Sequence, residues 1–474
     1  MIKVLSVASE VAPLIKTGGL ADVAGALPAA MAGLDVQMRT VLPGYPSVLA
    51  QVTGGTVVAQ FADLFGGTAQ VRAVDHGGLD LLVLDAPHLY DRAGGPYVTD
   101  EGRDHPDNDV RFAALSFVAA HLAKTGADGW MPDLVHGHDW QAGLVPEYLH
   151  AMGADTPFVF TIHNIAFHGN TAADRLEALR LDPARFHADA FEFWGQISAL
   201  KAGLASATKI NTVSQTYAEE LMTPHFGMGM DGILQARKAD LVGIVNGIDT
   251  QVWNPATDVH VANYKTPKGK AKAKVALRTE FGLPKSDGPL CVLVSRLTDQ
   301  KGIDLVLQAL PTLTGQGGQL ALLGSGDTSL QVALLERAAH DDNVAVKIGY
   351  DEALSHRMMA GGDAILVPSR FEPCGLTQLY GLRYGTVPVV ALTGGLADTV
   401  INANPAAMAS RVATGVQFSP ITADAFANAL TRTCDLFKDK TAWARLQANG
   451  MAQPVGWETS AKAYAALYHS ALKG

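Results

Sequence analysis

The turn that follows the apolar run at residues 364–368 carries residue types suited to binding a small ligand. Glu372 lies in this turn, and Gly375 and Thr377 follow it at the start of a helical pattern. In an open α/β sheet, such a junction of strand, turn and helix is where the ligand binds. Backbone N–H groups at a helix start suit a phosphate, and a carboxylate beside them suits the hydroxyl groups of a sugar. One site for both indicates a sugar nucleotide.

A basic pair precedes this junction in the chain. Arg296 and Lys301 stand around a glycine turn after another apolar run, so both cations can reach one pyrophosphate. Exposed basic residues at a helix start are the alternative, and the Glu372 turn makes that alternative the weaker one. The segment Gly324-Ser325-Gly326 does not fit a dinucleotide fingerprint, because the third glycine would fall at Ser329. NAD binding is therefore disfavoured.

A further candidate is the loop after the first apolar run, where Lys16, Gly18 and Gly19 precede a helical pattern. Glycines let a ligand approach the backbone closely, and the lysine adds a charge for a phosphate. On this segment alone, a tight turn with a surface lysine explains the residues equally well. The loop is not a Walker loop, because the order G-x-x-x-x-G-K-[ST] is absent.

Three histidines lie near the carboxyl ends of two expected strands and suggest a metal site: His136, His138 and His163. Because the residues of a strand alternate between its two faces, His136 and His138 need not converge on one ion. The ends of parallel strands form the binding edge of a sheet, so a sugar-binding cleft is favoured over core packing. The residues that we expect to line this cleft are Asp139, Trp140, His163 and Asn164.

These candidates need a scaffold of strands and helices to position them. The expected strands lie at residues 4–8, 36–42, 81–84, 134–136, 158–162, 291–294, 320–323, 344–348, 364–367 and 387–390. The expected helices lie at residues 20–32, 110–124, 301–310, 355–360 and 376–384. Such alternation is typical of doubly wound parallel sheets. The sequence therefore predicts an α/β protein with two such domains facing across a cleft, with a hinge near residues 246–255.

The composition limits the possible functions. The 474 residues suggest two or three domains, and the low charged fraction of 17% favours a large, well-buried enzyme. A net charge of −10 argues against binding of nucleic acid by a basic surface. The lysine run at residues 265–274 is expected to be a solvated face or a helix start rather than an anion-binding patch.

Cysteine usage indicates a reducing compartment. Cys291, Cys374 and Cys434 form no C-x-x-C pair, so neither a disulfide framework nor a zinc site is expected. Glu10 ends the first apolar run too early for a signal peptide, and no segment is expected to span a membrane. We therefore expect a cytoplasmic protein. The place of Cys374 at a helix start could lower the pKa of its thiol.

Short segments along the whole chain closely resemble the glycogen and starch synthase family. They are Lys16-Thr-Gly-Gly-Leu-Ala-Asp-Val, His138-Asp-Trp, Thr161-Ile-His-Asn, Val245-Asn-Gly-Ile-Asp, Ser295-Arg-Leu-Thr-Asp-Gln-Lys-Gly, Ser369-Arg-Phe-Glu-Pro-Cys-Gly-Leu and Thr393-Gly-Gly-Leu. Any one of them is modest support, but the ordered set is highly specific.

The resemblance implies a GT-B fold, in which two Rossmann-like doubly wound domains face each other across a central cleft, with no metal or other cofactor. It implies an acceptor-side domain at residues 1–248, a nucleotide-sugar domain at 249–456, and a helix at 457–474 that crosses back to the first domain. The implied reaction transfers glucose from ADP-glucose to the non-reducing 4-hydroxyl of an α-1,4-glucan (glycogen) primer, with retention of configuration. Neither nucleic acid nor a membrane is an expected partner.

The resemblance also implies roles for single residues. Those expected at the reacting atoms are His163, Arg296, Lys301 and Glu372. Those expected to bind the donor are Lys16, Gly18, Gly19, Asn246, Tyr350, Cys374, Gly375, Leu376 and Thr377, with Tyr350 against the adenine. Those expected near the glucose or the acceptor are Asp22, Tyr97, Asp139, Trp140 and Asn164.

Three positions depart from the pattern of the family. Tyr380 stands where many relatives have a second glutamate, His168 where a glutamine is frequent, and Leu392 where an arginine is frequent. Two alternative functions stay open from the sequence. One is another GT-B enzyme that uses UDP-glucose, such as a sucrose or trehalose-phosphate synthase. The other is a non-catalytic glucan-binding protein, although such a protein should have lost the charged cleft residues that this chain keeps.

Overall fold

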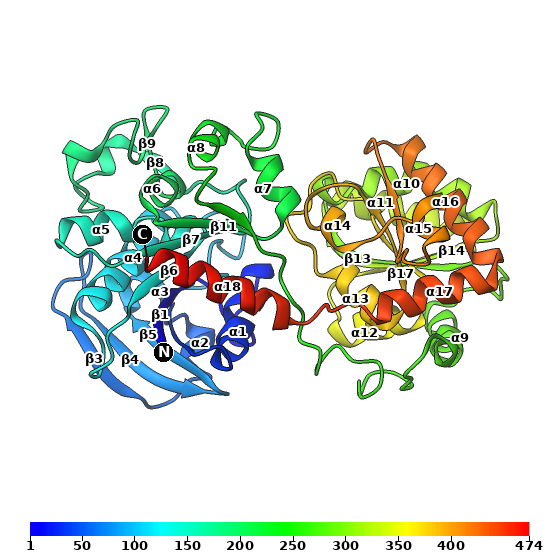
Figure 1. The fold of residues 1–474 in the computed structure, drawn as a ribbon, viewed down its shortest axis with the longest axis horizontal. Coiled ribbons are helices and arrows are strands. Elements are labelled where there is room, and N and C mark those ends of the chain that lie inside the picture. The colour runs from blue at the N-terminus through cyan, green and yellow to red at the C-terminus, as the bar shows by residue number, and fades with distance from the viewer. Residues whose placement is uncertain (474) are drawn as a thin grey trace. The chain divides into compact units, whose positions relative to one another are not determined.

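The structure, a computed structural model that describes residues 1–473, divides into two compact units. The first unit comprises Met1–Val213, Ala218–Ile244 and the residues from Trp457 onward. The second comprises Ser214–Tyr217 and Val245–Gly456. Each unit has its own central sheet (Figure 1).

The sheet of the first unit has nine strands in the described residues, in the order β12-β11-β7-β6-β1-β2-β5-β4-β3. Their bounds are β1 (Ile2–Val7), β2 (Val36–Pro43), β3 (Thr56–Phe61), β4 (Ala69–His76), β5 (Leu79–Asp85), β6 (Leu134–His138), β7 (Phe158–Ile162), β11 (Lys209–Thr212) and β12 (Leu241–Gly243). Strand β4 pairs antiparallel with β3 and β5, and the other pairs are parallel. The strand order reverses between β1 and β6, and the crevice at such a reversal is where open α/β sheets bind ligands.

Helices and one small sheet surround this core. The helices are α1 (Gly19–Ala32), α2 (Pro46–Leu49), α3 (Pro87–Tyr90), α4 (Asn108–Thr125), α5 (Val145–Ala151), α6 (Ala199–Ser206), α7 (Gln215–Leu221), α8 (Asp231–Ala236) and α18 (Trp457–Ala471). The small sheet joins β8 (Asn170–Ala172), β10 (Gln196–Ser198) and β9 (Glu192–Phe193). Helix α18 buries Tyr464 and Tyr468 in one apolar cluster with Val4 and Leu27, so it completes the core of the first unit.

The second unit is built on a six-stranded parallel sheet in the order β15-β14-β13-β16-β17-β18. The strands are β13 (Leu290–Leu297), β14 (Gln319–Gly326), β15 (Val344–Ile348), β16 (Ala364–Val367), β17 (Val387–Ala391) and β18 (Val416–Phe418). This is the strand order of a Rossmann sheet, with its reversal between β13 and β16. The carboxyl ends of these two strands are therefore the expected binding edge.

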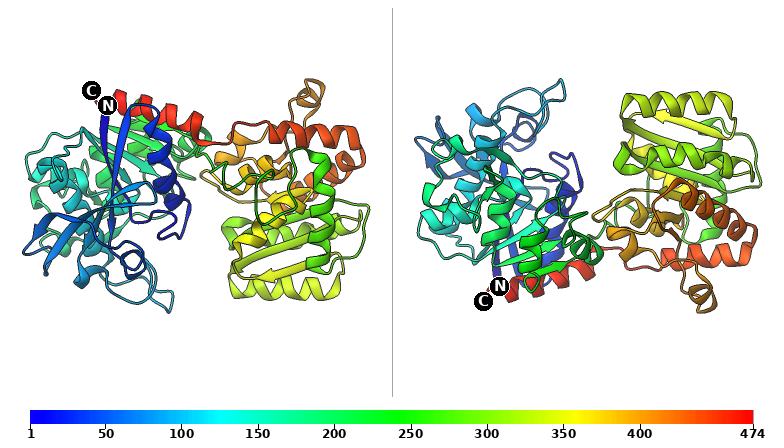
Figure 2. Two further views of the ribbon diagram at one scale, coloured as in Figure 1. Left: turned by 90° about the horizontal axis from the view of Figure 1, so that it is seen from below. Right: turned by 90° about the horizontal axis from the view of Figure 1, so that it is seen from above.

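Both faces of this sheet are covered by helices (Figure 2). They are α9 (Lys270–Phe281), α10 (Ile303–Thr314), α11 (Thr328–His340), α12 (Glu352–Gly361), α13 (Thr377–Tyr384), α14 (Gly394–Thr399), α15 (Pro405–Ala409), α16 (Ala423–Lys438) and α17 (Lys440–Met451). Alternate residues of β13 enter different cores: Cys291 packs with residues of α10 and α16, whereas Val292 packs with residues of α9 and α12. Burial on both faces explains why these strands read as continuous apolar runs.

The predicted scaffold is confirmed. The strands at residues 158–162, 344–348 and 364–367 have the bounds that the sequence predicts, and the other predicted elements differ by a few residues at their ends. In the two central sheets, strands β3, β4, β11, β12 and β18 have no counterpart in the prediction. Strand β4 lies between β5 and the edge strand β3 and mixes apolar and polar residues, so it lacks the signal of a buried parallel strand.

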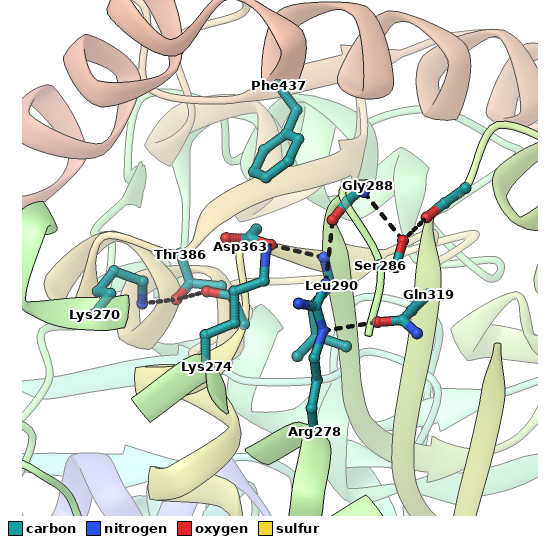
Figure 3. A network of polar contacts seen from close by, with 12 residues as sticks. Lys270, Lys274, Arg278, Ser286, Gly288, Leu290, Gln319, Asp363, Thr386 and Phe437 are labelled. Atoms are coloured by element: carbon teal, nitrogen blue, oxygen red, sulfur yellow. Dashed lines mark hydrogen bonds and ion pairs between the residues drawn. The ribbon is translucent and has the colours of Figure 1, made fainter. Parts of the chain in front are cut away.

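The lysine run at residues 265–274 is more than the predicted solvated face or helix start. Helix α9 does begin at Lys270, but this side chain is buried. Its Nζ donates to the carbonyl oxygens of Ala360 (2.8 Å) and Tyr384 (2.9 Å) and to the hydroxyl oxygen of Thr386 (2.7 Å; Figure 3). Burial lowers the pKa of Lys270 to about 7. The lysine thus satisfies carbonyl groups near the ends of α12 and α13 that lack partners within their helices.

Lys274 lies one helical turn beyond Lys270 and also faces inward. Its Nζ lies 2.6 Å from Oδ2 of Asp363 and 4.9 Å from the ring centre of Phe437. The same carboxylate oxygen accepts a hydrogen bond from the backbone N–H of Leu290, at 2.7 Å. Residues four apart share one face of a helix, so both lysines point inward and attach α9 to the sheet. The number of charges along the sequence does not show which lysines do so.

We predict that Lys270→Met destabilises the second unit by about 2 kcal/mol or more, because buried carbonyl groups lose their donor. Lys272 is exposed on the same helix, so Lys272→Met is the matched control and should change stability by less than about 0.5 kcal/mol. Urea denaturation of the two variants and the wild type measures both effects. Equal transition midpoints for Lys270→Met and the wild type would contradict the structural role given to Lys270.

Candidate active site

The loop after β1 presents Lys16, Gly18 and Gly19 at the start of α1, and all three residues are exposed. Lys16 pairs with Asp22 through an Nζ–Oδ1 distance of 2.7 Å. A Cβ atom added at Gly18 or Gly19 would meet no described atom within 4 Å, and neither glycine has a positive φ. Packing within the described chain therefore does not explain these glycines, whereas a ligand that approaches the backbone would.

Asp139 organises the loops that follow β6 and β7. Its Oδ1 accepts hydrogen bonds from the backbone N–H groups of His163 (2.7 Å) and Asn164 (3.4 Å). The Oδ1 of Asn164 in turn accepts from the N–H of Ala166, at 3.0 Å. Burial raises the pKa of Asp139 to about 7. The structure thus brings together three residues that the sequence predicts near the sugar.

The premise that His136 and His138 point to opposite faces of their strand is wrong. Their ring centres lie 4.2 Å apart, because residues two positions apart in a strand return to the same face. Their nitrogens are nevertheless engaged by protein groups: Nδ1 of His136 lies 2.8 Å from the Tyr468 hydroxyl, and its Nε2 lies 2.6 Å from Thr161 Oγ1. Residues 1–473 contain no cluster of three or more His, Cys, Asp or Glu side chains arranged to hold a metal ion.

His138 connects the interior of the first unit to His163. Its Nδ1 lies 3.0 Å from Nε2 of His163, and its Nε2 lies 3.3 Å from Oγ of Ser6. Burial lowers the pKa of His138 to about 3 and holds the pKa of His163 well below its ordinary value. Both rings are therefore neutral at physiological pH, and His163 is held in place by a hydrogen bond rather than by a charge.

Tyr97 and Trp140, the expected acceptor residues, are joined by an aromatic contact. The ring centre of Phe112 lies 5.8 Å from that of Tyr97 and 5.0 Å from that of Trp140. A Cβ atom on Gly169 would come within 2.2 Å of the Trp140 ring, and its φ is +61°, so glycine is needed there. Trp140 and Phe112 also line a small hollow together with Leu144 and Ile197.

In the second unit the structure brings Lys301 and Glu372 together at the sheet reversal. The Nζ of Lys301 lies 2.5 Å from Oε2 of Glu372, and this oxygen also accepts from the hydroxyl of Ser369, at 2.8 Å. Gly302 makes the approach possible: its φ is +67°, and a Cβ atom there would lie 2.1 Å from the carbonyl oxygen of Pro368. The turn that carries Lys301 therefore packs directly on the chain that leaves β16.

Arg296 is the penultimate residue of β13, and its side chain is exposed. It forms no ion pair with any other residue in the described part of the chain, whereas Lys301 is already paired with Glu372. Register places Arg296 opposite Ser325 of β14. Of the two predicted cations, Arg296 therefore has no carboxylate partner in the described residues, and Lys301 is held in place by one.

The segment from Cys374 to Thr377 forms the start of α13. Gly375 has a φ of +69°, which favours glycine, and no described side chain caps the helix start at Leu376 and Thr377. The backbone N–H groups of this first turn are thus free to receive an anion. The expected lowering of the Cys374 pKa is wrong: burial raises it to about 12, because an apolar setting disfavours the thiolate.

Two further predicted donor residues differ in their surroundings. Asn246 is buried, and its Oδ1 has no hydrogen-bond partner among the described residues. Because an unpaired buried amide oxygen is costly, this atom is well suited to receive a ligand hydroxyl. Tyr350 is 77% exposed and follows β15, with its hydroxyl donating to Glu352 at 3.0 Å. Its ring is accessible for stacking.

Comparison with known proteins gives the family of the chain. Residues 3–236 match the family described as the starch synthase catalytic domain, and residues 278–448 match glycosyl transferases group 1. The chain is 68% identical, over the full length of both proteins, to a glycogen synthase of Jannaschia sp. (strain CCS1). It is 59% identical to a glycogen synthase of Paracoccus denitrificans, over 99% of each chain. The chain belongs to the glycogen and starch synthase family. It is accordingly a glycosyltransferase, as the resemblance of its motifs predicts.

Solved structures support the same assignment of fold. The chain is similar to the catalytic domain of starch synthase IV from Arabidopsis thaliana bound to ADP and acarbose, with a TM-score of 0.89 and 31% identity over all of both chains. A sucrose-phosphate synthase from Thermosynechococcus elongatus aligns with a TM-score of 0.61 and 18% identity, over 99% of this chain and 98% of that one, and shows the fold alone. The predicted GT-B architecture of two Rossmann-like units is confirmed. No helix within residues 1–473 has the length and apolar character needed to cross a membrane.

The positions that depart from the family pattern have structural surroundings of their own. The ring of Tyr380 stacks on Trp253 at 3.7 Å between centres, and Trp253 stacks on His356 at 3.8 Å. Tyr380 is thus part of a packed aromatic row in this family member. Leu392 is 48% exposed, and Nε2 of His168 is buried without a partner among the described residues.

Glu10 is a site residue that the sequence prediction does not include. It lies in the loop that follows β1, after Ala8 and Ser9, and is only 3% exposed. Its carboxylate accepts from the hydroxyls of Thr17 (2.6 Å) and Tyr97 (2.5 Å) and from the N–H of Gly18 (3.3 Å), as well as from the N–H of Thr17. The available signal was a carboxylate at the end of a buried strand, just before the glycine loop.

We predict that Asp139 makes stability depend on pH. Burial raises its pKa to about 7 from an ordinary value of 3.8, so the folded chain keeps a proton that the unfolded chain releases. This contribution is fully present below about pH 4 and is lost as the pH rises towards 7. Between pH 5 and 7 the wild type should lose about 2–3 kcal/mol of unfolding free energy relative to Asp139→Asn, which can still accept from the backbone.

Chemical denaturation of both proteins at several pH values tests this prediction. The difference between wild type and Asp139→Asn should shrink or reverse along the series from pH 5 to 7 and stay constant above pH 8. A difference that is independent of pH would show that the Asp139 carboxyl is ionised throughout.

Proposed function

We propose that this chain transfers glucose from ADP-glucose to the non-reducing 4-hydroxyl of an α-1,4-glucan, with retention of configuration and release of ADP, in glycogen biosynthesis. The observation that carries the proposal is the set of groups at the reversal of the second sheet. There the Lys301–Glu372 pair lies beside the uncapped start of α13. Arg296, near the end of β13, is exposed and has no ion-pair partner among the described residues. These groups suit a pyrophosphate that is joined to a sugar.

The proposed role of the cations is to stabilise the leaving group. Departure of ADP develops negative charge on its terminal phosphate, and fixed positive groups that meet this charge lower the barrier. Glu372 holds the Lys301 ammonium at 2.5 Å, so the lysine is already positioned before the ligand binds. The start of α13 adds backbone N–H groups, among them that of Thr377.

The proposed roles of the other site residues follow from their surroundings. Asn246 offers its unpartnered Oδ1 to a hydroxyl of the donor glucose, and His163 and Asp139 are assigned to the same sugar. Tyr97 and Trp140 are assigned to the glucan, because aromatic faces suit the apolar faces of sugar rings. In this scheme residues 1–248 form the acceptor side and residues 249–456 the donor side of the enzyme, and the C-terminal helix is α18 at Trp457–Ala471.

The proposed reaction proceeds on one face of the sugar. The bond between the anomeric carbon and the phosphate oxygen breaks, and a bond from the same carbon to the acceptor 4-oxygen forms. The proton of the acceptor hydroxyl passes to the departing phosphate, so no protein base is required. The scheme includes no metal or other cofactor, and we place the reaction in the cytoplasm because the cysteines are free and buried.

The first experiment is to measure nucleotide release from ADP-glucose and from UDP-glucose, with and without a glycogen primer. The proposal requires release of ADP that depends on the primer and is much faster than release of UDP. Faster release of UDP would keep the fold and assign another donor. Release of neither nucleotide would favour a protein that only binds glucan.

We predict that Lys301→Ala lowers kcat by about 100-fold or more, because the charge opposite the developing phosphate anion is lost. Lys272→Ala, which removes an exposed lysine of α9, is the matched control and should keep the turnover of the wild type. Steady-state kinetics with saturating ADP-glucose and glycogen measures both variants. Wild-type turnover in Lys301→Ala would remove this lysine from the leaving-group role.

A further inference from the structure

Glu10 stands between two parts of the first unit that the proposed reaction uses. Its carboxylate accepts from the hydroxyl of Thr17 at 2.6 Å and from the N–H of Gly18 at 3.3 Å, so it holds the glycine loop. It also accepts from the hydroxyl of Tyr97, at 2.5 Å. The loop is assigned to the donor and Tyr97 to the glucan, so one carboxylate touches both groups of residues.

The charge of the Glu10 carboxylate makes its hydrogen bonds to the loop and to Tyr97 depend on one another. Glu10 is 3% exposed and has no ion pair with any described lysine, arginine or histidine. A buried carboxylate without a cation depends on its hydrogen-bond donors, and such charge-assisted bonds are stronger than neutral ones. The donors of the loop and of Tyr97 therefore share the stabilisation of one charge. Loss of any one of them shifts the carboxylate and changes its bonds to the rest.

The hydroxyl of Tyr97 is the donor in its hydrogen bond to Glu10. Burial and the neighbouring Glu10 charge raise the pKa of Tyr97 well above its ordinary value, so the phenol stays protonated. Its oxygen also lies 2.8 Å from Oγ of Ser9, the residue that precedes Glu10 in the chain. Tyr97 is thus linked to the end of β1 at two adjacent residues.

The loop has a particular need for this support. Gly18 is the N-cap of α1, and no side chain caps it in the way that Ser, Thr, Asp or Asn would. Adjacent glycines also lose more conformational entropy on ordering than other residues do. Glu10 reaches the N–H groups of Thr17 and Gly18 from outside the helix and so orders the loop before any ligand arrives.

We propose that Glu10 is a positioning residue that couples the glycine loop at residues 16–19 to Tyr97, so that donor binding and glucan binding depend on each other through one carboxylate. This inference rests on the proposed function for the identity of the two ligands. Coupling of this kind is reciprocal: a change at Tyr97 must affect the donor, and a change at the loop must affect the glucan.

The test compares variants on either side of Glu10. Tyr97→Phe removes one donor to the carboxylate, and Thr17→Val removes another while the backbone bonds stay. Each is expected to raise the KM of both ADP-glucose and glycogen at least threefold. Trp140→Phe, a change at a proposed glucan residue that does not contact Glu10, should raise the KM of glycogen and leave that of ADP-glucose within twofold.

Variants that also carry Glu10→Gln test whether the effect of Tyr97 on the donor passes through the Glu10 carboxylate. Once the carboxylate is gone, adding Tyr97→Phe should change the KM of ADP-glucose by less than twofold, whereas the same change in the wild type raises it at least threefold. Binding of ADP, measured by calorimetry without glucan, should show the same pattern. An ADP affinity that Tyr97→Phe leaves unchanged, or a Tyr97 effect that persists in Glu10→Gln, would overturn the proposal.

A second measurement separates this inference from the proposed function. Hydrogen–deuterium exchange of a peptide that covers residues 16–19, without any ligand, should be faster in Tyr97→Phe and Glu10→Gln than in the wild type and unchanged in Trp140→Phe. This readout needs no turnover, so it holds even if another nucleotide sugar is the donor. Unchanged exchange in all variants would show that Glu10 does not order the loop.

Discussion

Burial of a parallel sheet on both faces is the constraint on which this structure depends. In the second unit neighbouring residues of β13 enter separate cores, so polar chemistry has no place along the strands and is confined to their ends. The strand orders of the two sheets reverse between β1 and β6 and between β13 and β16. Glu10, Asp139, Arg296 and Glu372 lie in or just after these four strands. The candidate site thus follows from the topology of the sheets.

Buried carboxyl groups at these sheet edges are held by hydrogen-bond donors. Each of three uses a different set of donors: Asp139 uses backbone N–H groups, Glu372 uses Lys301 and Ser369, and Glu10 uses a loop and a tyrosine. The donors include residues that are distant in sequence from the carboxyl group, such as Lys301 for Glu372 and Tyr97 for Glu10. These carboxyl groups therefore order the loops around them, because a buried carboxyl group without hydrogen-bond partners is unfavourable.

The sequence predicted correctly where a residue type or pattern has the same structural role in most proteins. Continuous apolar runs located the buried strands, and motif residues such as Lys301 and Glu372 proved to be in contact. It failed where the meaning depends on tertiary partners. Lys270 looks like a surface lysine until the carbonyl groups around it are known, and Cys374 looks activated until its burial is known. His136 and His138 needed only the correct period of a strand, and Glu10 needed the position of Tyr97.

The place of α18 in the first unit has a consequence for synthesis of the protein. The helix supplies Tyr468, whose hydroxyl lies against the buried His136, yet it is encoded after the whole of Val245–Gly456. At roughly 5–20 residues per second, a ribosome needs on the order of 10–40 s to traverse that stretch. Throughout this interval the nascent first unit lacks part of its core. Completion of its core therefore waits until the second unit has been synthesised, even though its sheet is synthesised first.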